Sequence, residues 1–190
     1  MQVSREDAKL VTAGLRTPPT GLDLALEILA ALTVAVAIAF LAVAWSGLPE
    51  RVPTHFDASG APDAFGSRWS LWGLAGVMVA LYAVLYAMKF APPRLWNLPF
   101  TVTSANAQAV GSLLARFSRV MNLACTALFG ALLVGSVRVA LGQAGGLPVW
   151  TTLVGVLLLF GALAWVLITL SRLGRGGAAS KPAARHHGSR

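Results

Sequence analysis

The polar and apolar positions of the chain separate into long blocks rather than alternating over a few residues. Four blocks are almost free of charge and cover residues 28–48, 69–88, 120–137 and roughly 150–170. A helix needs about 20 apolar residues, each rising about 1.5 Å, to cross a hydrocarbon layer about 30 Å thick. The pattern therefore predicts an all-α integral membrane protein with four transmembrane helices.

The composition agrees with a bilayer environment. Of 190 residues, 56% are hydrophobic and 12% charged, and the mean hydropathy is +0.70. A net charge of +8 is also typical of nucleic-acid binding, but the basic residues flank the apolar blocks instead of covering one face of a polar domain. We expect the lipid bilayer as a partner and no nucleic acid. The single cysteine, Cys125, excludes a disulfide within the chain.

The distribution of Lys and Arg predicts the orientation. Four spans put both termini on one side of the membrane, and only three of the fifteen basic residues, Arg51, Arg68 and Arg138, fall on the other side. Cytoplasmic segments of membrane proteins are enriched in Lys and Arg. Both termini are thus predicted to be cytoplasmic in a multi-pass protein of the bacterial inner (plasma) membrane. Residues 48–69, which join the first two spans, then face outward.

The blocks also predict the domain organisation. Residues 1–27 form a cytoplasmic tail, residues 28–171 a four-helix membrane domain, and residues 172–190 a basic, disordered cytoplasmic tail. The segment from Ser104 either extends the third helix into the cytosol or lies on the membrane surface. The small residues Ala42 to Ala44 resemble a signal-peptide cleavage site, but the long polar leader favours an uncleaved anchor.

The segment between the first two spans is built to hold a shape. It contains Pro49, Pro53 and Pro62, which fix backbone angles, and the sequences DASG and PDAFG, which favour tight turns. We expect a short structured outer loop that folds back onto the helix ends.

His55 is the most reactive residue of this loop and has three interpretations. It forms a structural hydrogen bond, contacts a ligand or partner, or binds a metal with carboxylates such as Asp57 and Asp63. The structural role is favoured, and one histidine falls short of a metal-ligand set, so we expect no metal and no cofactor. We also expect a structural ion pair between Arg138 and one of the loop carboxylates, Glu50, Asp57 or Asp63.

The loop resembles a known signature. Matching positions are Leu48, Pro49, Val52, Pro53, His55, Phe56, Gly60, Pro62, Asp63, Gly66, Ser67 and Arg68. The pattern is similar to a bacterial membrane module of unknown function found at the N-terminus of sporulation-delay immunity (SdpI-like) proteins. The chain departs from it at Asp57, where Asn is more frequent, and at Arg68, where Lys is frequent. The second module of those immunity proteins is not recognisable in this sequence.

The resemblance implies protection against a secreted membrane-active peptide, with a repressor held at the cytoplasmic side. We therefore predict a binding, immunity or signalling protein whose outer loop contacts a secreted peptide or envelope protein and whose inner side contacts a cytoplasmic regulator. The candidate contact residues are Pro49, Pro53, His55, Phe56, Asp57, Gly60, Asp63 and Arg68.

Two other classes of protein are a transporter or channel component and an enzyme. The alternative is a transporter or channel component that acts as a homo-oligomer. A monomeric ion-coupled transporter is not expected, because no span carries an ionisable residue near its centre. Small residues at four-residue spacing suit either bundle packing or self-association. An enzyme is not expected, because the sequence contains no recognised catalytic motif.

Overall fold

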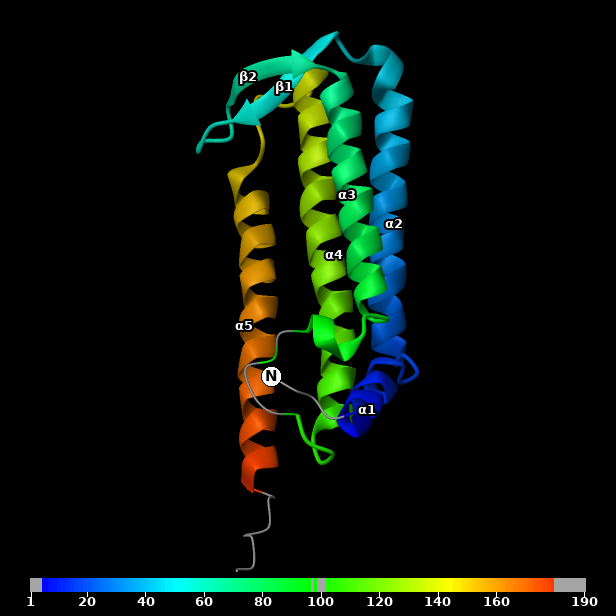
Figure 1. Cartoon of the computed structure of the whole chain (residues 1–190). Helices are drawn as coiled ribbons and strands as arrows, with labels where there is room; N and C mark the ends of the chain where they lie inside the picture. Colours follow the sequence, from blue (N-terminus) through cyan, green and yellow to red (C-terminus); the bar gives the residue numbers. More distant parts are fainter. Residues whose placement is uncertain (1–4, 97, 99–101, 180–190) are drawn as a thin grey trace, which may run out of the picture.

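The computed structural model describes residues 5–96, 98 and 102–179 and shows a long helical bundle with a small sheet over one end (Figure 1). The elements, in chain order, are α1 (Arg5–Leu15), α2 (Gly21–Ala44), the 3-10 helix η1 (Trp45–Gly47), β1 (Arg51–Phe56), β2 (Pro62–Ser67), α3 (Trp69–Met88), the 3-10 helix η2 (Pro93–Leu95), α4 (Ala107–Ala140) and α5 (Val149–Ala179).

Among the described residues, four helices are long and apolar enough to cross a membrane. They cover Gly21–Gly47, Trp69–Met88, Ala107–Ala140 and Val149–Arg175. The predicted number of spans is confirmed, and the second span has the predicted bounds. The chain therefore has the architecture of a multi-pass membrane protein in contact with the lipid bilayer.

Helix α4 lies at the centre of the bundle. It packs against α1, α2, α3, α5 and β1, whereas α5 packs mainly against α4 (Figure 1). Of the most apolar stretch of α4, 39% is buried inside the protein, against 17% in each of the other three spans. Any displacement of α4 therefore affects every other long helix.

Two apolar clusters hold the bundle together, one toward each end. The first joins α2, α3, α4 and the sheet, and its fully buried members include Leu41, Val52 and Leu133. The second joins α1, α4 and α5 around Val11, Val110 and other residues. The sheet and α1 are thus anchored to opposite ends of α4.

Helix ends follow local capping as well as hydropathy. Helix α2 begins at Gly21, seven residues before the predicted apolar block, because Thr20 forms a capping box with Asp23. Thr20 Oγ1 accepts from the backbone N–H of Asp23, and the Asp23 carboxylate accepts from the backbone N–H of Thr20. Such reciprocal bonds satisfy two N–H groups that a helix otherwise leaves free.

The tails differ from the prediction. Residues Arg5–Leu15, predicted as part of a tail, form α1 and pack against α4. Gly14 of α1 and Gly111 of α4 meet at this crossing, where a Cβ on either would collide with the backbone of the other helix. Helix α5 continues to Ala179, so the tail predicted to begin at residue 172 starts helical, and residues 180–190 lie outside the described residues.

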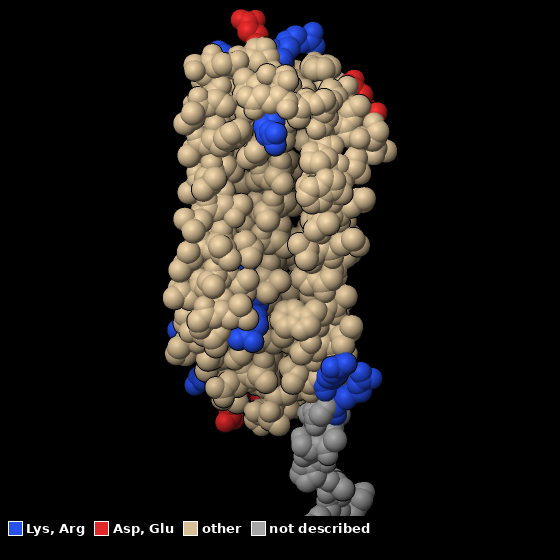
Figure 2. All heavy atoms as spheres, turned by 180° about the vertical axis from the view of Figure 1, so that it is seen from behind, with Lys and Arg blue, Asp and Glu red and all other residues tan. Residues whose placement is uncertain are grey.

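On the face shown in Figure 2, charged side chains lie toward the two ends of the molecule, and the middle of the face is almost uncharged. The sides expose large apolar residues, such as Val43 on α2, Val84 on α3 and Leu157 on α5. In water such surfaces would drive aggregation, but hydrocarbon chains cover them without cost. The uncharged band is consistent with a bilayer around the middle of the bundle.

Candidate functional site

The segment predicted to be a shaped loop is a β-hairpin. Strands β1 and β2 pair antiparallel, from Arg51 opposite Ser67 to Phe56 opposite Pro62, with irregular register around His55. The sequence signals predicted the turns but not the strands. The hairpin closes over the ends of α3 and α4 and is continuous with α2 and α3 (Figure 1).

Asp57 organises the turn of the hairpin. Its Oδ1 accepts hydrogen bonds from the hydroxyl of Ser59 at 2.6 Å, the backbone N–H of Ser59 at 2.8 Å and that of Ala61 at 3.0 Å. The Ser59 hydroxyl and the Ala61 N–H hold the pKa of Asp57 below its ordinary value, because they donate to the ionised carboxylate. Asp57 is therefore committed to the turn, although its side chain is exposed.

Gly60 ties the turn to the loop between α4 and α5. Its carbonyl oxygen accepts from the backbone N–H of Leu147 at 2.8 Å. It has a φ of 84°, and a Cβ at this position would collide with the carbonyl group of Leu147. Both the backbone angle and the close approach require glycine. The turn is thus fixed to the bundle rather than free in solvent.

The base of the hairpin is fixed as well. Val52 is fully buried and Pro53 is buried, whereas Pro49 is exposed and Phe56 is half-buried. The Arg68 guanidinium lies over the ring of Trp45 at 4.8 Å, and the Arg68 backbone N–H donates to the backbone carbonyl oxygen of Glu50 at 2.9 Å. Arg68 therefore closes the base of the hairpin.

His55 and Asp63 meet on the exposed side of the hairpin. Nδ1 of His55 lies 2.6 Å from Oδ1 of Asp63, and the two side chains are 69% and 46% exposed. A polar side-chain pair with such exposure contributes only about 0–1 kcal/mol to stability, even when both groups are charged. Within the described part of the chain, no third His, Cys, Asp or Glu approaches to complete a metal site. The pair shapes the surface of the hairpin more than it stabilises the fold.

Arg138, predicted to pair with a loop carboxylate, forms no such pair among the described residues. Arg138 is exposed, and it takes part in none of the ion pairs of the described residues. Asp63 pairs with His55, and Asp57 is occupied by the turn. Arg138 lies in the last turn of α4, where the free carbonyl groups of the helix favour a cation without a carboxylate partner.

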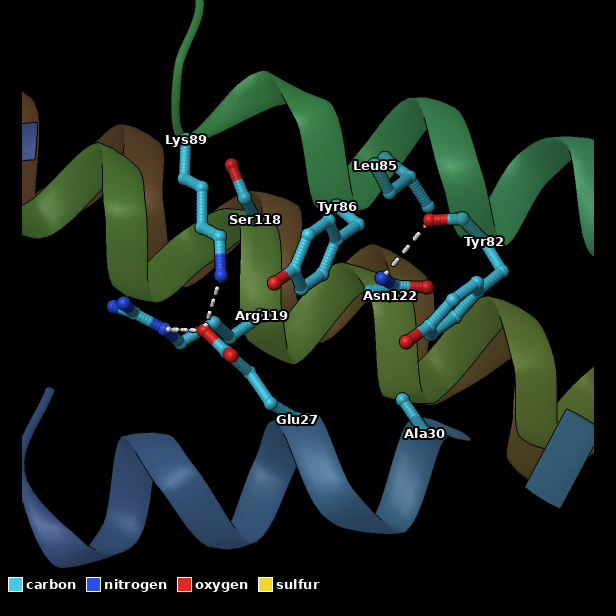
Figure 3. Close-up of a pocket in the computed structure, with 9 residues that line it drawn as sticks. All are labelled: Glu27, Ala30, Tyr82, Leu85, Tyr86, Lys89, Ser118, Arg119 and Asn122. Carbon is cyan, nitrogen blue, oxygen red and sulfur yellow. Dashed lines mark hydrogen bonds and ion pairs between the residues drawn. The ribbon is translucent and has the colours of Figure 1, made fainter. Parts of the chain in front are cut away.

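A second polar site lies at the opposite end of the bundle, and we call it the charge cluster. Its centre is Glu27 of α2, whose Oε1 lies 2.9 Å from Nζ of Lys89 at the end of α3 and 2.7 Å from Nε of Arg119 of α4 (Figure 3). The side chain of Arg119 is only 8% exposed. One carboxylate thus connects three helices.

Asp23 and Arg116 complete the charge cluster. Arg116 donates from Nε to Oδ1 of Asp23 at 3.0 Å and from Nη2 to Oδ2 at 3.3 Å. Arg119 lies 3.9 Å from the same carboxylate. The charge cluster contains three cations, Lys89, Arg116 and Arg119, and the two carboxylates of Asp23 and Glu27. It therefore carries one net positive charge.

A small cavity of about 10 Å³ adjoins the charge cluster, between α2, α3 and α4 (Figure 3). Asn122 is 4% exposed, and its Nδ2 donates to the carbonyl oxygen of Tyr82 at 3.2 Å. Its Oδ1 finds no partner among the described residues. The space is sufficient for about one water molecule, which would satisfy that oxygen.

In the sequence these charged residues are recognisable only as flanks of the apolar blocks. A usable signal was present, because Asp23 and Glu27 are four residues apart and Arg116 and Arg119 three apart, so each pair shares one helix face. Side chains of opposite charge on two neighbouring helices, at the same depth in the membrane, favour ion pairs between those helices. The extension of the third helix before residue 120 was one of the two predictions, but its packing against the start of the first span was not predicted.

Comparisons with known proteins cover part of the chain. Residues 32–79 match a family described as a domain of unknown function, DUF1648, from the middle of α2 through the hairpin into α3. An uncharacterized protein of Archaeoglobus fulgidus is 39% identical over 75 residues, which is 35% of this chain and 41% of the archaeal protein. The chain thus covers less than half the length of that relative. No solved structure matches.

Proposed function

We propose that this chain is a binding protein of the bacterial inner membrane, in which the hairpin contacts a secreted peptide or an envelope protein. The observation that carries the proposal is the fixed presentation of an exposed polar pair. Val52 and Gly60 attach the hairpin to the bundle, while His55 and Asp63 remain open to solvent. A rigid surface loses less conformational entropy on binding than a mobile loop.

The proposed orientation places the hairpin outside the cell and the charge cluster at the cytoplasmic side. It rests on the excess of Lys and Arg at the end opposite the hairpin. The charge cluster ties α2, α3 and α4 together at that end, so a tilt of the hairpin would be transmitted through rigid helices to a cytoplasmic regulator. The resemblance of the loop to immunity proteins makes a secreted membrane-active peptide the favoured ligand. No catalytic role is part of the proposal.

The test uses survival of cells challenged with a panel of secreted, membrane-active cationic peptides. Cells that express the full chain are expected to survive a peptide that kills cells without it. The double variant His55→Ala/Asp63→Ala should lose protection, because it removes the exposed pair at small cost in stability. Gln143→Ala, an exposed polar change at the same end, is the matched control. Equal survival with and without the protein would reject the immunity role.

The alternative is a transporter or channel component that acts as an oligomer. One observation favours it, namely the buried charge cluster beside a cavity with the unsatisfied oxygen of Asn122. Buried ionisable groups between transmembrane helices often mark ion pathways. Ion flux in liposomes containing the purified chain, abolished by Asn122→Leu and unchanged by His55→Ala, would favour this alternative over the hairpin proposal.

A further inference from the structure

A larger cavity lies on the other side of the charge cluster, between the α1–α2 connection, α4 and α5. Its volume is about 450 Å³, within the range of about 300–1,000 Å³ that is usual for small-molecule sites. The residues that line it include Thr17, Thr20 and Ser112, together with Arg116 and Arg119. Guanidinium groups are donors suited to the oxygens of a phosphate group, whereas the hydroxyl of Thr20 already donates to Oδ2 of Asp23 at 2.7 Å.

The cations of this cavity are held in place. Asp23 fixes Arg116 through two hydrogen bonds, and Nη2 of Arg116 is also 3.5 Å from Oγ1 of Thr20. Among the described residues, Nη1 of Arg116 has no acceptor within hydrogen-bonding distance. The carboxylate of Asp23 also lines the cavity, but both of its oxygens already accept hydrogen bonds. A donor therefore remains available while the acidic group is satisfied.

The position of the cavity indicates the kind of anion. Arg116 and Arg119 directly precede the apolar block of α4, and Thr20 directly precedes the apolar helix α2. This is the level at which lipid headgroups lie when the apolar blocks span the hydrocarbon layer. The remaining walls include Leu113 and Trp165, which suit the glycerol and upper acyl region.

We propose that this cavity binds the phosphate headgroup of an anionic phospholipid. Arg116 and Arg119 supply the positive charge, Nη1 of Arg116 and the exposed hydroxyl of Thr17 supply donors, and the apolar wall of α4 and α5 accommodates the start of the acyl chains. Basic cavities between transmembrane helices favour anionic headgroups for this reason. The proposal does not depend on the function of the hairpin.

The test compares lipid retention by the purified full chain. Protein solubilised from an equal mixture of phosphatidylglycerol and phosphatidylcholine is examined by native mass spectrometry. We expect about fivefold enrichment of phosphatidylglycerol, as one accessible guanidinium near a membrane surface would give. The double variant Asp23→Asn/Arg116→Gln removes the accessible guanidinium together with its carboxylate partner and should lower the enrichment. Arg138→Gln, which removes an exposed charge at the opposite end, should retain it.

Three outcomes would overturn the proposal. They are equal retention of both lipids by the wild type, undiminished enrichment in the double variant, and loss of the enrichment in Arg138→Gln. Inorganic phosphate provides a further arm, because its displacement of the lipid at millimolar concentration would assign the site to a soluble anion. An unchanged elution volume and melting temperature of the double variant would show that it is folded. If the double variant unfolds, the single variant Thr17→Ala takes its place, and it is expected to lower the enrichment in part.

Discussion

Arg119 is the residue whose removal tests the packing of the charged end most severely. Its side chain is 8% exposed and bonds Glu27 at 2.7 Å, with Asp23 at 3.9 Å. Breaking a buried ion pair costs about 3–5 kcal/mol, because the remaining charge is left without compensation. Glu27 keeps Lys89 as a partner, so we expect Arg119→Gln to lower the free energy of unfolding by about 3 kcal/mol, at the lower end of that range.

The double variant Glu27→Gln/Arg119→Gln separates charge from packing. It removes the carboxylate that Arg119→Gln leaves with a single cationic partner, and it leaves Lys89 over the ring of Tyr86, 3.7 Å from its centroid. We expect it to recover at least about 1 kcal/mol relative to Arg119→Gln, as residues in one network do not act additively. The reverse order of the two stabilities would contradict the network.

The assay is reversible unfolding in detergent micelles, followed by tryptophan fluorescence as the denaturant concentration rises. Arg138→Gln is the control, because it makes the same chemical change at an exposed site and should stay within about 0.5 kcal/mol of the wild type. A cost below about 1 kcal/mol for Arg119→Gln would refute the reasoning, since it would mean that the side chain is solvated.

Three further predictions concern the turn of the hairpin and the crossing of α1 with α4. Gly60→Ala should cost about 3 kcal/mol, from the positive φ and the collision of the added Cβ, and should expose the hairpin to proteases, whereas Gly76→Ala, which has open space, should not. Because the pKa of Asp57 is lowered in the folded protein, its contribution to the stability of the turn is complete above the ordinary Asp pKa and is lost as the pH falls through the folded pKa. Protease cleavage of the turn should therefore increase below about pH 4. Asp57→Asn should remove this dependence on pH. Gly111→Val should detach α1 and speed tryptic cleavage after Arg16, and unchanged cleavage would contradict the close helix crossing.

Hydropathy predicted the spans because the bilayer imposes one dominant requirement, a continuous apolar helix. The bounds Trp69–Met88 followed directly, since Arg68 and Lys89 limit the apolar block on both sides. The start of α2 did not, because the Thr20 capping box extends the helix beyond its apolar block. Helix α1 was missed because it is stabilised by contact with α4 rather than by its own composition.

The candidate sites were also predicted only in part from the sequence. Proline and glycine spacing predicted a folded connection, and the structure adds the strand pairing and the contact of Gly60 with Leu147, which is distant in sequence. The association of Glu27 with Lys89 and Arg119 depends on three helices meeting at one depth. Such a contact follows from tertiary packing, which single-helix patterns do not specify.

The central claim is that the hairpin end faces outward while the charge cluster lies at the cytoplasmic side. It is tested most directly by labelling cysteines in intact cells with a membrane-impermeant maleimide, in a chain in which Cys125 is replaced by Ser. We predict that His55→Cys is labelled without permeabilisation and that Ser104→Cys is labelled only after it. Labelling of position 104 from outside, with position 55 protected until the cells are opened, would contradict the account.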